Sequence, residues 1–191
     1  MSTTAHSPKV VDLVRRLDQA VATDDPHALC QNVKRVLTEV VSSGEQFVGS
    51  PFLEPAPDRY ARRLLHHDPA GRYSVVVMVW DRGQGTPLHD HAGVWCVECV
   101  YRGRIRVTSY DIEGDPAAGT VQFTPETVVL AGIGEAGALI PPFEYHMIEN
   151  PDETPAITIH VYGGEMTWCH AFFPLEEGGY RRERRQLSYT A

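Results

Sequence analysis

Hydrophobic residues recur at helical spacing in two segments near the start of the chain, 8–22 and 26–43. Within each segment they stand three or four positions apart, as on the buried face of an amphipathic helix. The residues on these faces are Val11, Val14, Leu17 and Val21 in the first segment, and Leu29, Val33, Val36, Leu37 and Val40 in the second. Ser7 and Asp25 each precede a proline at the start of a segment, a combination typical of a helix N-cap and first turn. We therefore predict two N-terminal α-helices.

The rest of the chain shows a different pattern, in which short runs of β-branched and aromatic residues alternate with turns. A proline- and glycine-rich connector at 49–57 and a short predicted helix at 58–66 come first, and β patterns dominate from Tyr73 onward. The predicted strands are 73–80, 94–101, 103–110, 119–123, 126–131, 137–140, 145–149 and 156–162. Many short strands at this spacing are typical of a sandwich or a barrel. The predicted fold class is mainly β with N-terminal α-helices.

The composition is that of an ordinary globular domain. The chain has 191 residues, of which 42% are hydrophobic and 22% are charged, enough to bury a sizeable core. We expect a single domain over residues 1–191, with a helical segment at about 8–45 and a β-barrel at about 58–175. The arginine-rich segment 180–185 is expected to be a solvated terminal segment.

Net charge and apolar runs limit the possible partners. A net charge of −8 argues against a general nucleic-acid binder, because phosphate contacts require clustered lysine and arginine. The first residues lack the apolar core of a signal peptide, and the longest apolar runs, such as 75–80, are too short to cross a bilayer. We expect a cytoplasmic protein that binds neither nucleic acid nor membranes and whose four cysteines are mostly reduced. The sequence defines no oligomeric state.

One pair of histidines is especially informative about chemistry. His89 and His91 stand one residue apart, so both side chains project from the same face of an extended segment. That face can offer two imidazole nitrogens to one metal ion, whereas Asp90 points to the other side. Gly83 and Gly103 bracket the segment and allow tight turns at both of its ends.

A second pattern, Cys96-Val-Glu-Cys99, is formally a CxxC, a spacing found in redox and zinc sites. Positions i and i+3 of a strand face opposite sides of the sheet, so the two thiols could not act together. The sequence also has no second CxxC that would complete a four-thiolate zinc site. We interpret the spacing as fortuitous.

The histidine pair lies in a stretch that resembles the first motif of the cupin superfamily. Gly83, His89, His91 and Gly103 stand in register with that motif, and Cys96 occupies the position where cupins normally have glutamate. The resemblance implies a double-stranded jelly-roll barrel, in agreement with the strand pattern.

A later stretch resembles the second cupin motif. Pro141, His146 and Asn150 match it, whereas Phe143 stands where glycine is usual. The resemblance implies that His146 joins the two histidines of the first motif as a metal ligand. The two motifs thus supply three histidines and no carboxylate. We therefore expect a mainly β, cupin double-stranded jelly-roll barrel with N-terminal α-helices.

A more specific resemblance covers about residues 58–172 and rests on the order and spacing of short motifs. These are Tyr60-Ala-Arg62, His89-Asp-His91, Cys96, His146, Thr158-Ile-His160-Val-Tyr162 and Cys169-His-Ala-Phe172. Together they resemble the thiol dioxygenases, in particular the cysteine dioxygenase family. The resemblance implies an Fe(II) cofactor, which imidazole ligands alone would not select. It also implies the addition of both atoms of O2 to the sulfur of cysteine, which gives cysteine sulfinic acid.

The resemblance assigns Arg62 to the substrate carboxylate, which a guanidinium can bind through two parallel hydrogen bonds. Tyr60 is expected beside the arginine. A shift of one residue in this alignment would give the role to Arg63 instead. Without the resemblance, Arg62 would be expected at the surface of a short helix, because charged residues are mostly exposed.

Thr158, His160 and Tyr162 stand at alternate positions of one predicted strand and so share a face. The resemblance implies that Tyr162 points its hydroxyl toward the iron site, with His160 and Thr158 behind it. Thr158 departs from the serine that is usual in the family but still supplies a hydroxyl. Cys96 departs from the glycine of many bacterial relatives and resembles the animal enzymes, in which this cysteine forms a thioether with the active-site tyrosine.

Simpler explanations and other functions remain open from the sequence alone. Tyr162 and His160 are also compatible with barrel-lining residues, and Cys96 with a plain buried thiol. A 3-mercaptopropionate dioxygenase would use the same sulfur and carboxylate contacts, although Arg62 and Cys96 favour cysteine. A non-catalytic metal-binding cupin, acting as a sensor or binding module, would use the same pocket, since fold alone does not imply activity.

Overall fold

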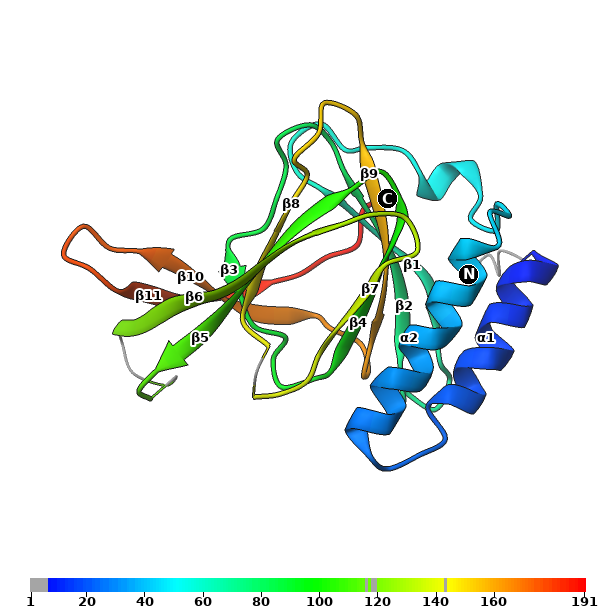
Figure 1. The fold of residues 1–191 in the computed structure, drawn as a ribbon, viewed down its shortest axis with the longest axis horizontal. Helices are drawn as coiled ribbons and strands as arrows, with labels where there is room; N and C mark the ends of the chain where they lie inside the picture. The colour runs from blue at the N-terminus through cyan, green and yellow to red at the C-terminus, as the bar shows by residue number, and fades with distance from the viewer. Residues whose placement is uncertain (1–6, 116, 118–119, 143) are drawn as a thin grey trace.

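The computed structural model describes residues 7–115, 117, 120–142 and 144–191. Phe143, which departs from the second cupin motif, lies outside the described residues. The described chain is mainly β, and its two α-helices precede the strands (Figure 1). None of the helices in the described ranges is long and apolar enough to cross a membrane.

Two helices, α1 (Pro8–Ala20) and α2 (Pro26–Ser42), confirm the predicted helical segments to within a few residues. The carboxylate of Asp25 accepts a hydrogen bond from the backbone N–H of His27 at 3.0 Å and so caps α2 as predicted. The predicted buried face of α1 is partly wrong, because Val11 is exposed. The residues of α1 that are buried are Val10, Leu13, Leu17 and Ala20. Because Val10 and Val11 are adjacent, two neighbouring faces of the helix carry apolar residues. Packing against the sheet determines which of these faces is buried.

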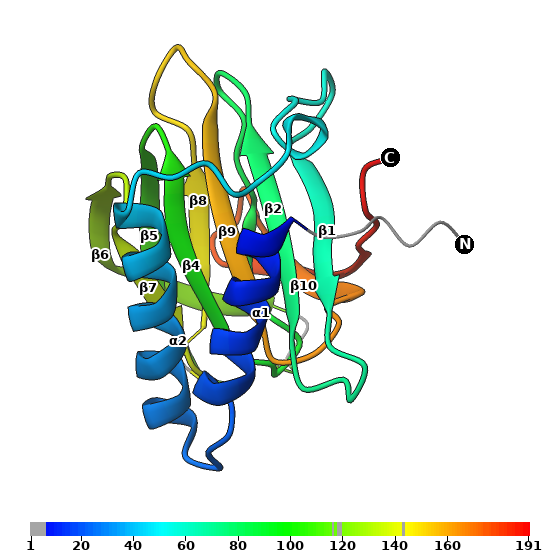
Figure 2. The ribbon, with the colours of Figure 1, turned by 90° about the vertical axis from the view of Figure 1, so that its right-hand side faces the viewer.

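The strands form two layers. They are β1 (Ala61–His67), β2 (Ser74–Trp80), β3 (Leu88–His89), β4 (Cys96–Arg102), β5 (Ile105–Glu113), β6 (Thr120–Ala131), β7 (Ala136–Leu139), β8 (His146–Glu149), β9 (Ala156–Tyr162), β10 (Trp168–Pro174) and β11 (Tyr180–Gln186), and a 3₁₀ helix, η1 (Ser50–Phe52), precedes β1. Five strands make a sheet in the order β1-β2-β9-β4-β7, and the other six close into a ring, β10-β11-β6-β5-β8-β3. Helices α1 and α2 cover the outer face of the five-stranded sheet (Figure 2). This arrangement confirms the predicted fold class.

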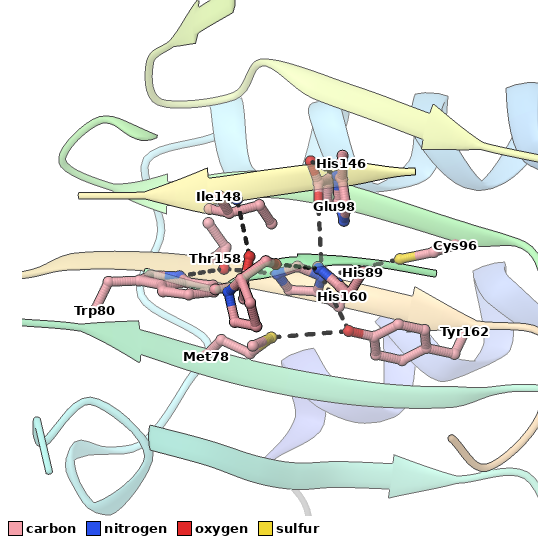
Figure 3. A network of polar contacts seen from close by, with 12 residues as sticks. Met78, Trp80, His89, Cys96, Glu98, His146, Ile148, Thr158, His160 and Tyr162 are labelled. Carbon is pink, nitrogen blue, oxygen red and sulfur yellow. Dashed lines mark hydrogen bonds and ion pairs between the residues drawn. The ribbon is translucent and has the colours of Figure 1, made fainter. Parts of the chain in front are cut away.

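Alternate residues of β9 belong to different faces of the five-stranded sheet. The helix-side face packs against α1 and α2, and the barrel-side face points between the two layers. On the helix-side face, β9 contributes Ile157, Ile159 and Val161. On the barrel-side face, it contributes Thr158, His160 and Tyr162 (Figure 3). One strand therefore supplies both the core and a row of buried polar groups.

Cys96 and Cys99 lie on opposite faces of β4, as predicted. Cys99 belongs to the helix-side core, whereas Cys96 packs on the barrel side in one cluster with Tyr162 and Cys169. All four cysteines of the chain are buried and free of disulfide bonds. The CxxC spacing therefore makes no two-thiol site.

The helix predicted at 58–66 is wrong, because most of this segment is strand β1. It pairs antiparallel with β2, and Arg62 lies opposite Met78. Strand β2 is buried along its whole length and needs hydrogen-bonding partners on both edges, of which β9 supplies one. This pairing outweighs the weak local preference of a segment rich in arginine and histidine.

The segment 180–185 is half-buried to exposed, as expected of a solvated segment, but it forms most of strand β11, which the sequence did not predict. That strand pairs with β10, which in turn pairs with β3, the strand that carries His89. Long arginine side chains suit an exposed hairpin because their alkyl stems cover neighbours while their charges stay in water. One of them, Arg184, places its guanidinium carbon 4.3 Å from the ring centroid of Trp168. The described part of the two segments predicted at 119–131 merges into β6.

Candidate metal centre and substrate cavity

A cavity of about 330 Å³ lies between the two layers of strands, a volume in the range of small-molecule sites. Its lining brings together residues that lie far apart in the sequence. They include Tyr60, Arg62, His89, His91, His146, His160, Tyr162 and Cys169. Figure 3 shows several of these side chains, which come from strands of both layers.

Three histidines converge on this cavity. His89 on β3 lies directly opposite His146 on β8, and His91 follows β3 in the chain. The ring centroids are 4.7 Å apart for His89 and His146, 5.0 Å for His91 and His146, and 5.2 Å for His89 and His91. One ring nitrogen of each lies within 4.8 Å of the others. The structure thus brings the three histidines named from the two motifs into one three-histidine group.

The three-histidine group is suited to bind a divalent metal ion. Burial, followed by repulsion from neighbouring histidines, lowers the pKa of His91 and His146 well below the usual value, so both rings are neutral. Nδ1 of His89 lies 3.1 Å from the carbonyl oxygen of Pro87, which leaves Nε2 for a metal. Both ring nitrogens of His146 and Nδ1 of His91 are buried without a hydrogen-bond partner among the described residues. A metal ion would satisfy such atoms, so the donor set fits one.

Asp90 lies between His89 and His91, and its side chain turns away from them, as the strand alternation predicts. Its carboxylate accepts a hydrogen bond from the backbone N–H of His170 at 2.8 Å and lies 2.8 Å from Nδ1 of the same residue. It also accepts a hydrogen bond from the backbone N–H of Ala92 at 3.1 Å. These contacts tie the histidine pair to β10 and fix the direction in which both rings point.

Thr158, His160 and Tyr162 form a chain of polar contacts on the barrel-side face of β9 (Figure 3). Thr158 Oγ1 lies 2.8 Å from His160 Nε2, and His160 Nδ1 lies 3.3 Å from the Tyr162 hydroxyl. Nε1 of Trp80 donates to Thr158 Oγ1 at 2.9 Å and fixes the start of the chain. Burial lowers the pKa of His160 to about 3 and raises the pKa of Tyr162 well above its usual value. Both groups are therefore neutral at pH 7, and the Tyr162 hydroxyl keeps its proton.

Arg62 lines the cavity and is only 5% exposed, whereas Arg63 donates to a backbone carbonyl at the surface. Nη2 of Arg62 donates to the carbonyl oxygen of Met166 at 2.7 Å. No carboxylate within the described ranges forms an ion pair with Arg62. Tyr60 lies in the same cavity, where its ring stacks on Trp80 with centroids 4.6 Å apart. A buried guanidinium without an anionic partner is costly, so this position favours an anionic ligand.

Cys96 on β4 lies directly opposite Tyr162 on β9. Side chains opposite each other on antiparallel strands have Cβ atoms about 4.5–5.5 Å apart, so Cys96 and Tyr162 are neighbours on the barrel-side face. The sulfur also lies 3.9 Å from Nδ1 of His160. Burial raises the pKa of the Cys96 thiol well above its usual value, so the sulfur is protonated at neutral pH. The arrangement can support a covalent link between Cys96 and Tyr162.

Glu98 is not among the predicted site residues, yet it lies beside two of the histidines (Figure 3). Its carboxylate oxygens are 4.0 Å from Nδ1 of His146 and 3.7 Å from Nδ1 of His160. Burial raises the pKa of Glu98 to about 8, so the carboxyl group is largely protonated at pH 7. Glu98 is not a member of the three-histidine group; with Cys96 and His160 it forms a second buried cluster, whose ligand atoms all lie within 4.8 Å of one another. Its position two residues after Cys96, on the same face of β4, is the signal in the sequence that could have identified it.

Comparisons with known proteins give a consistent result. The family model described as cysteine dioxygenase type I matches residues 1–174. Cysteine dioxygenase type 1 of Rattus norvegicus is 25% identical over 167 residues, which cover 85% of this chain and 78% of the rat protein. The Homo sapiens protein of the same name is 22% identical over 164 residues, with the same coverage of 85% and 78%.

A solved structure is also similar to this chain. It is an uncharacterized conserved protein with a double-stranded beta-helix domain from Klebsiella pneumoniae, with 18% identity and a TM-score of 0.47 over 64% of this chain and 94% of that chain. The family match begins at residue 1, ends at the last residue of β10 and includes every predicted site residue.

Proposed function

The chain belongs to the cysteine dioxygenase type I family, and from this premise we propose that it is an Fe(II)-dependent cysteine dioxygenase. The reaction joins one L-cysteine and one O2 to give cysteine sulfinic acid. Both oxygen atoms end on the sulfur, so the reaction needs no further reductant.

The observation that carries this proposal is the presence of Arg62 in the same cavity as the three-histidine group. Cysteine bears a carboxylate, an amine and a thiol within three carbons. Arg62 is buried and has no acidic partner among the described residues, so it would take the carboxylate through two parallel hydrogen bonds. A carboxylate held there leaves the amine and the thiol to face the histidines.

His89, His91 and His146 would hold the metal through neutral imidazole nitrogens. When bound, ferrous iron would bring the substrate sulfur and O2 together and mediate the transfer of electrons between them. Because the three-histidine group contains no carboxylate, these ligands would not neutralise the positive charge of the ion. The sulfur anion of the substrate would do so instead.

The hydroxyl group of Tyr162 would act as a hydrogen-bond donor inside the cavity. In this arrangement Thr158 donates its hydroxyl proton to His160 Nε2, and His160 Nδ1 donates to the oxygen of Tyr162. The Tyr162 hydroxyl donates to Sδ of Met78 at 3.8 Å in the structure, and a substrate oxygen would replace that weak acceptor. Because burial keeps this hydroxyl protonated, it serves as a hydrogen-bond donor over the whole neutral pH range.

We also propose a thioether between the sulfur of Cys96 and a ring carbon of Tyr162. Forming the carbon–sulfur bond removes the thiol hydrogen and one ring hydrogen, and O2, the oxidant of the proposed reaction, accepts the two electrons with the two protons and leaves as hydrogen peroxide. The intact mass should then lie about 2 Da below the mass calculated from the sequence, and Cys96→Ser should restore the calculated value for the variant. Four alkylatable thiols after denaturation would contradict the link for that preparation.

The proposed function is tested by oxygen uptake of the iron-loaded protein with three thiols, L-cysteine, 3-mercaptopropionate and cysteamine. We expect consumption of one O2 for each cysteine sulfinic acid, identified by its mass. A clear preference for 3-mercaptopropionate would overturn the choice of substrate. No sulfinate from any thiol would overturn the catalytic proposal and favour a non-catalytic metal-binding cupin.

A further inference from the structure

The last residues of the chain lie against the strand that carries Arg62. The backbone N–H of Thr190 donates to the carbonyl oxygen of Arg62 at 2.7 Å, and the backbone N–H of Arg62 donates to Thr190 Oγ1 at 3.0 Å. Strand β1 is at the edge of the five-stranded sheet. One of its two hydrogen-bonding sides pairs with β2, and the other side has no neighbouring strand in this sheet. Thr190 satisfies both backbone groups of Arg62 on that side. Figure 2 shows the end of the chain beside β1.

The same segment contacts the guanidinium group of Arg62. Its Cζ atom lies 4.9 Å from the ring centroid of Tyr189 and 5.8 Å from that of Tyr162. Nη2 is bound to the carbonyl oxygen of Met166. Leu187, at the start of the segment, lines the cavity itself. The guanidinium is therefore held by two aromatic rings and one carbonyl, while its other N–H groups have no hydrogen-bond partner in the described part of the chain.

The orientation of the guanidinium matters because its N–H groups bind a carboxylate through two parallel hydrogen bonds only when the two planar groups are aligned. A free arginine side chain would have to lose its rotational freedom each time a ligand binds. Contacts that fix the side chain beforehand remove that loss and raise the affinity for a carboxylate. A ligand without a carboxylate gains nothing from them.

We propose that residues 187–190 are part of the substrate site, where Tyr189 and Thr190 position Arg62 and thereby make the site selective for thiols that bear a carboxylate. This segment lies beyond residues 1–174, the part of the chain that matches the family model. The inference rests on the proposed function for its choice of thiols, but the contacts concern any carboxylate that reaches Arg62.

The test compares Tyr189→Leu, which removes the ring, with Tyr189→Phe, which keeps it. For the iron-loaded Tyr189→Leu protein we expect a KM for L-cysteine about tenfold higher with little change in kcat, as for the loss of one favourable contact to a charged group. Tyr189→Phe should keep the wild-type KM, because the ring and not the hydroxyl contacts Arg62. Affinity for cysteamine, which lacks a carboxylate, should be the same in all three proteins.

Calorimetric titration of the iron-loaded proteins without oxygen separates this inference from the proposed function. A weaker affinity of Tyr189→Leu for L-cysteine, with Tyr189→Phe unchanged, supports the inference even where the wild type makes no sulfinate. An unchanged affinity and KM overturn it even where the wild type is active. Equal losses for L-cysteine and cysteamine, or no binding of L-cysteine by the wild type, also overturn it.

A second pair of variants keeps the test available should Tyr189→Leu fail to fold. Thr190→Val removes the side-chain oxygen that accepts the N–H of Arg62, whereas Thr190→Ser keeps it. We expect the same selective loss of affinity for L-cysteine in Thr190→Val and none in Thr190→Ser. A loss in both variants, or in neither, contradicts the role of this contact.

Discussion

Strands β4 and β9 bury side chains on both faces of the five-stranded sheet, but the two faces differ in the kind of residue that is buried. On the helix-side face, Val97 and Ile159 are fully buried among other apolar side chains. On the barrel-side face, Glu98, His160 and Tyr162 are at most 4% exposed. Apolar groups gain stability simply from leaving water, whereas buried polar groups must find partners. Strand alternation thus separates the part of the sequence that forms the helix-side core from the part that lines the candidate site.

The largest expected effect comes from removing one member of the three-histidine group on the barrel side. In His146→Ala, activity should fall at least about 100-fold. Mutation of a residue that only hydrogen-bonds to a metal ligand already lowers metal affinity or activity about 10- to 100-fold, and loss of the ligand itself should cost more. Iron content per chain should fall with it, while the unfolding temperature of the metal-free protein stays close to that of the wild type. Full iron loading together with undiminished oxygen uptake would contradict the metal-binding role.

A smaller effect on activity is expected one step away from the proposed metal site. Thr158→Val removes the hydroxyl that contacts His160 and Trp80, and kcat should fall about 10- to 100-fold with iron content unchanged. Thr158→Ser keeps the hydroxyl and should retain most of the activity. A loss in Thr158→Ser with none in Thr158→Val would mean that the methyl group, and not the hydrogen bond, matters at this position.

On the helix-side face the expected effect is on stability alone. Leu37 of α2 is fully buried there, and Leu37→Ala should lower the free energy of unfolding by about 2–5 kcal/mol. Denaturant unfolding measures this loss. At temperatures where the variant stays folded, kcat per bound iron should equal the wild-type value. A reduced kcat under those conditions would show that the two faces are coupled.

The smallest expected effect lies in the turn between β1 and β2, where the helix-side face ends. The Asp68 carboxylate accepts hydrogen bonds from the backbone N–H and from Nε of Arg72, and Arg72 also pairs with Asp18 of α1. The side-chain contact with Arg72 lowers the pKa of Asp68 below its usual value. Stability from this group is therefore present above the unfolded pKa of about 4 and is lost as the pH falls toward the folded value.

Asp68→Asn should accordingly lower the free energy of unfolding by about 1 kcal/mol at pH 7, since Arg72 is partly solvated. The difference between the variant and the wild type should stay constant from pH 8 to pH 5 and shrink below about pH 4. Urea unfolding at a series of pH values measures it. A difference that persists unchanged in acid would rule out the charged contact as its source.

The contrast between the two faces also explains which elements could be predicted from the sequence. Strand β9 is predicted to its exact bounds, 156–162, because aliphatic and polar residues alternate along it and both sets are buried. Strands β1 and β11 are not, since their arginine-rich segments become strands only through pairing with β2 and β10. Local propensity carries no information about such partners.

The same limit applies to the candidate site. The three histidines follow from motif spacing, which is local. The burial of Arg62 follows only from β1 being a strand at the cavity. Its contact with Thr190 joins residues 128 positions apart, and no local sequence pattern predicts it. Glu98 is intermediate, because its face was readable from the alternation of β4 but its neighbours were not.

Trp80 gives the protein an internal optical probe. Its indole is fully buried, lines the cavity, stacks on Tyr60 and donates to Thr158. The other tryptophans of the chain, Trp95 and Trp168, do not line this cavity, so their emission should form a steady background. Because indole fluorescence responds to nearby charge and quenchers, occupancy of the cavity can be followed by fluorescence in a sealed cuvette, without a label and without turnover.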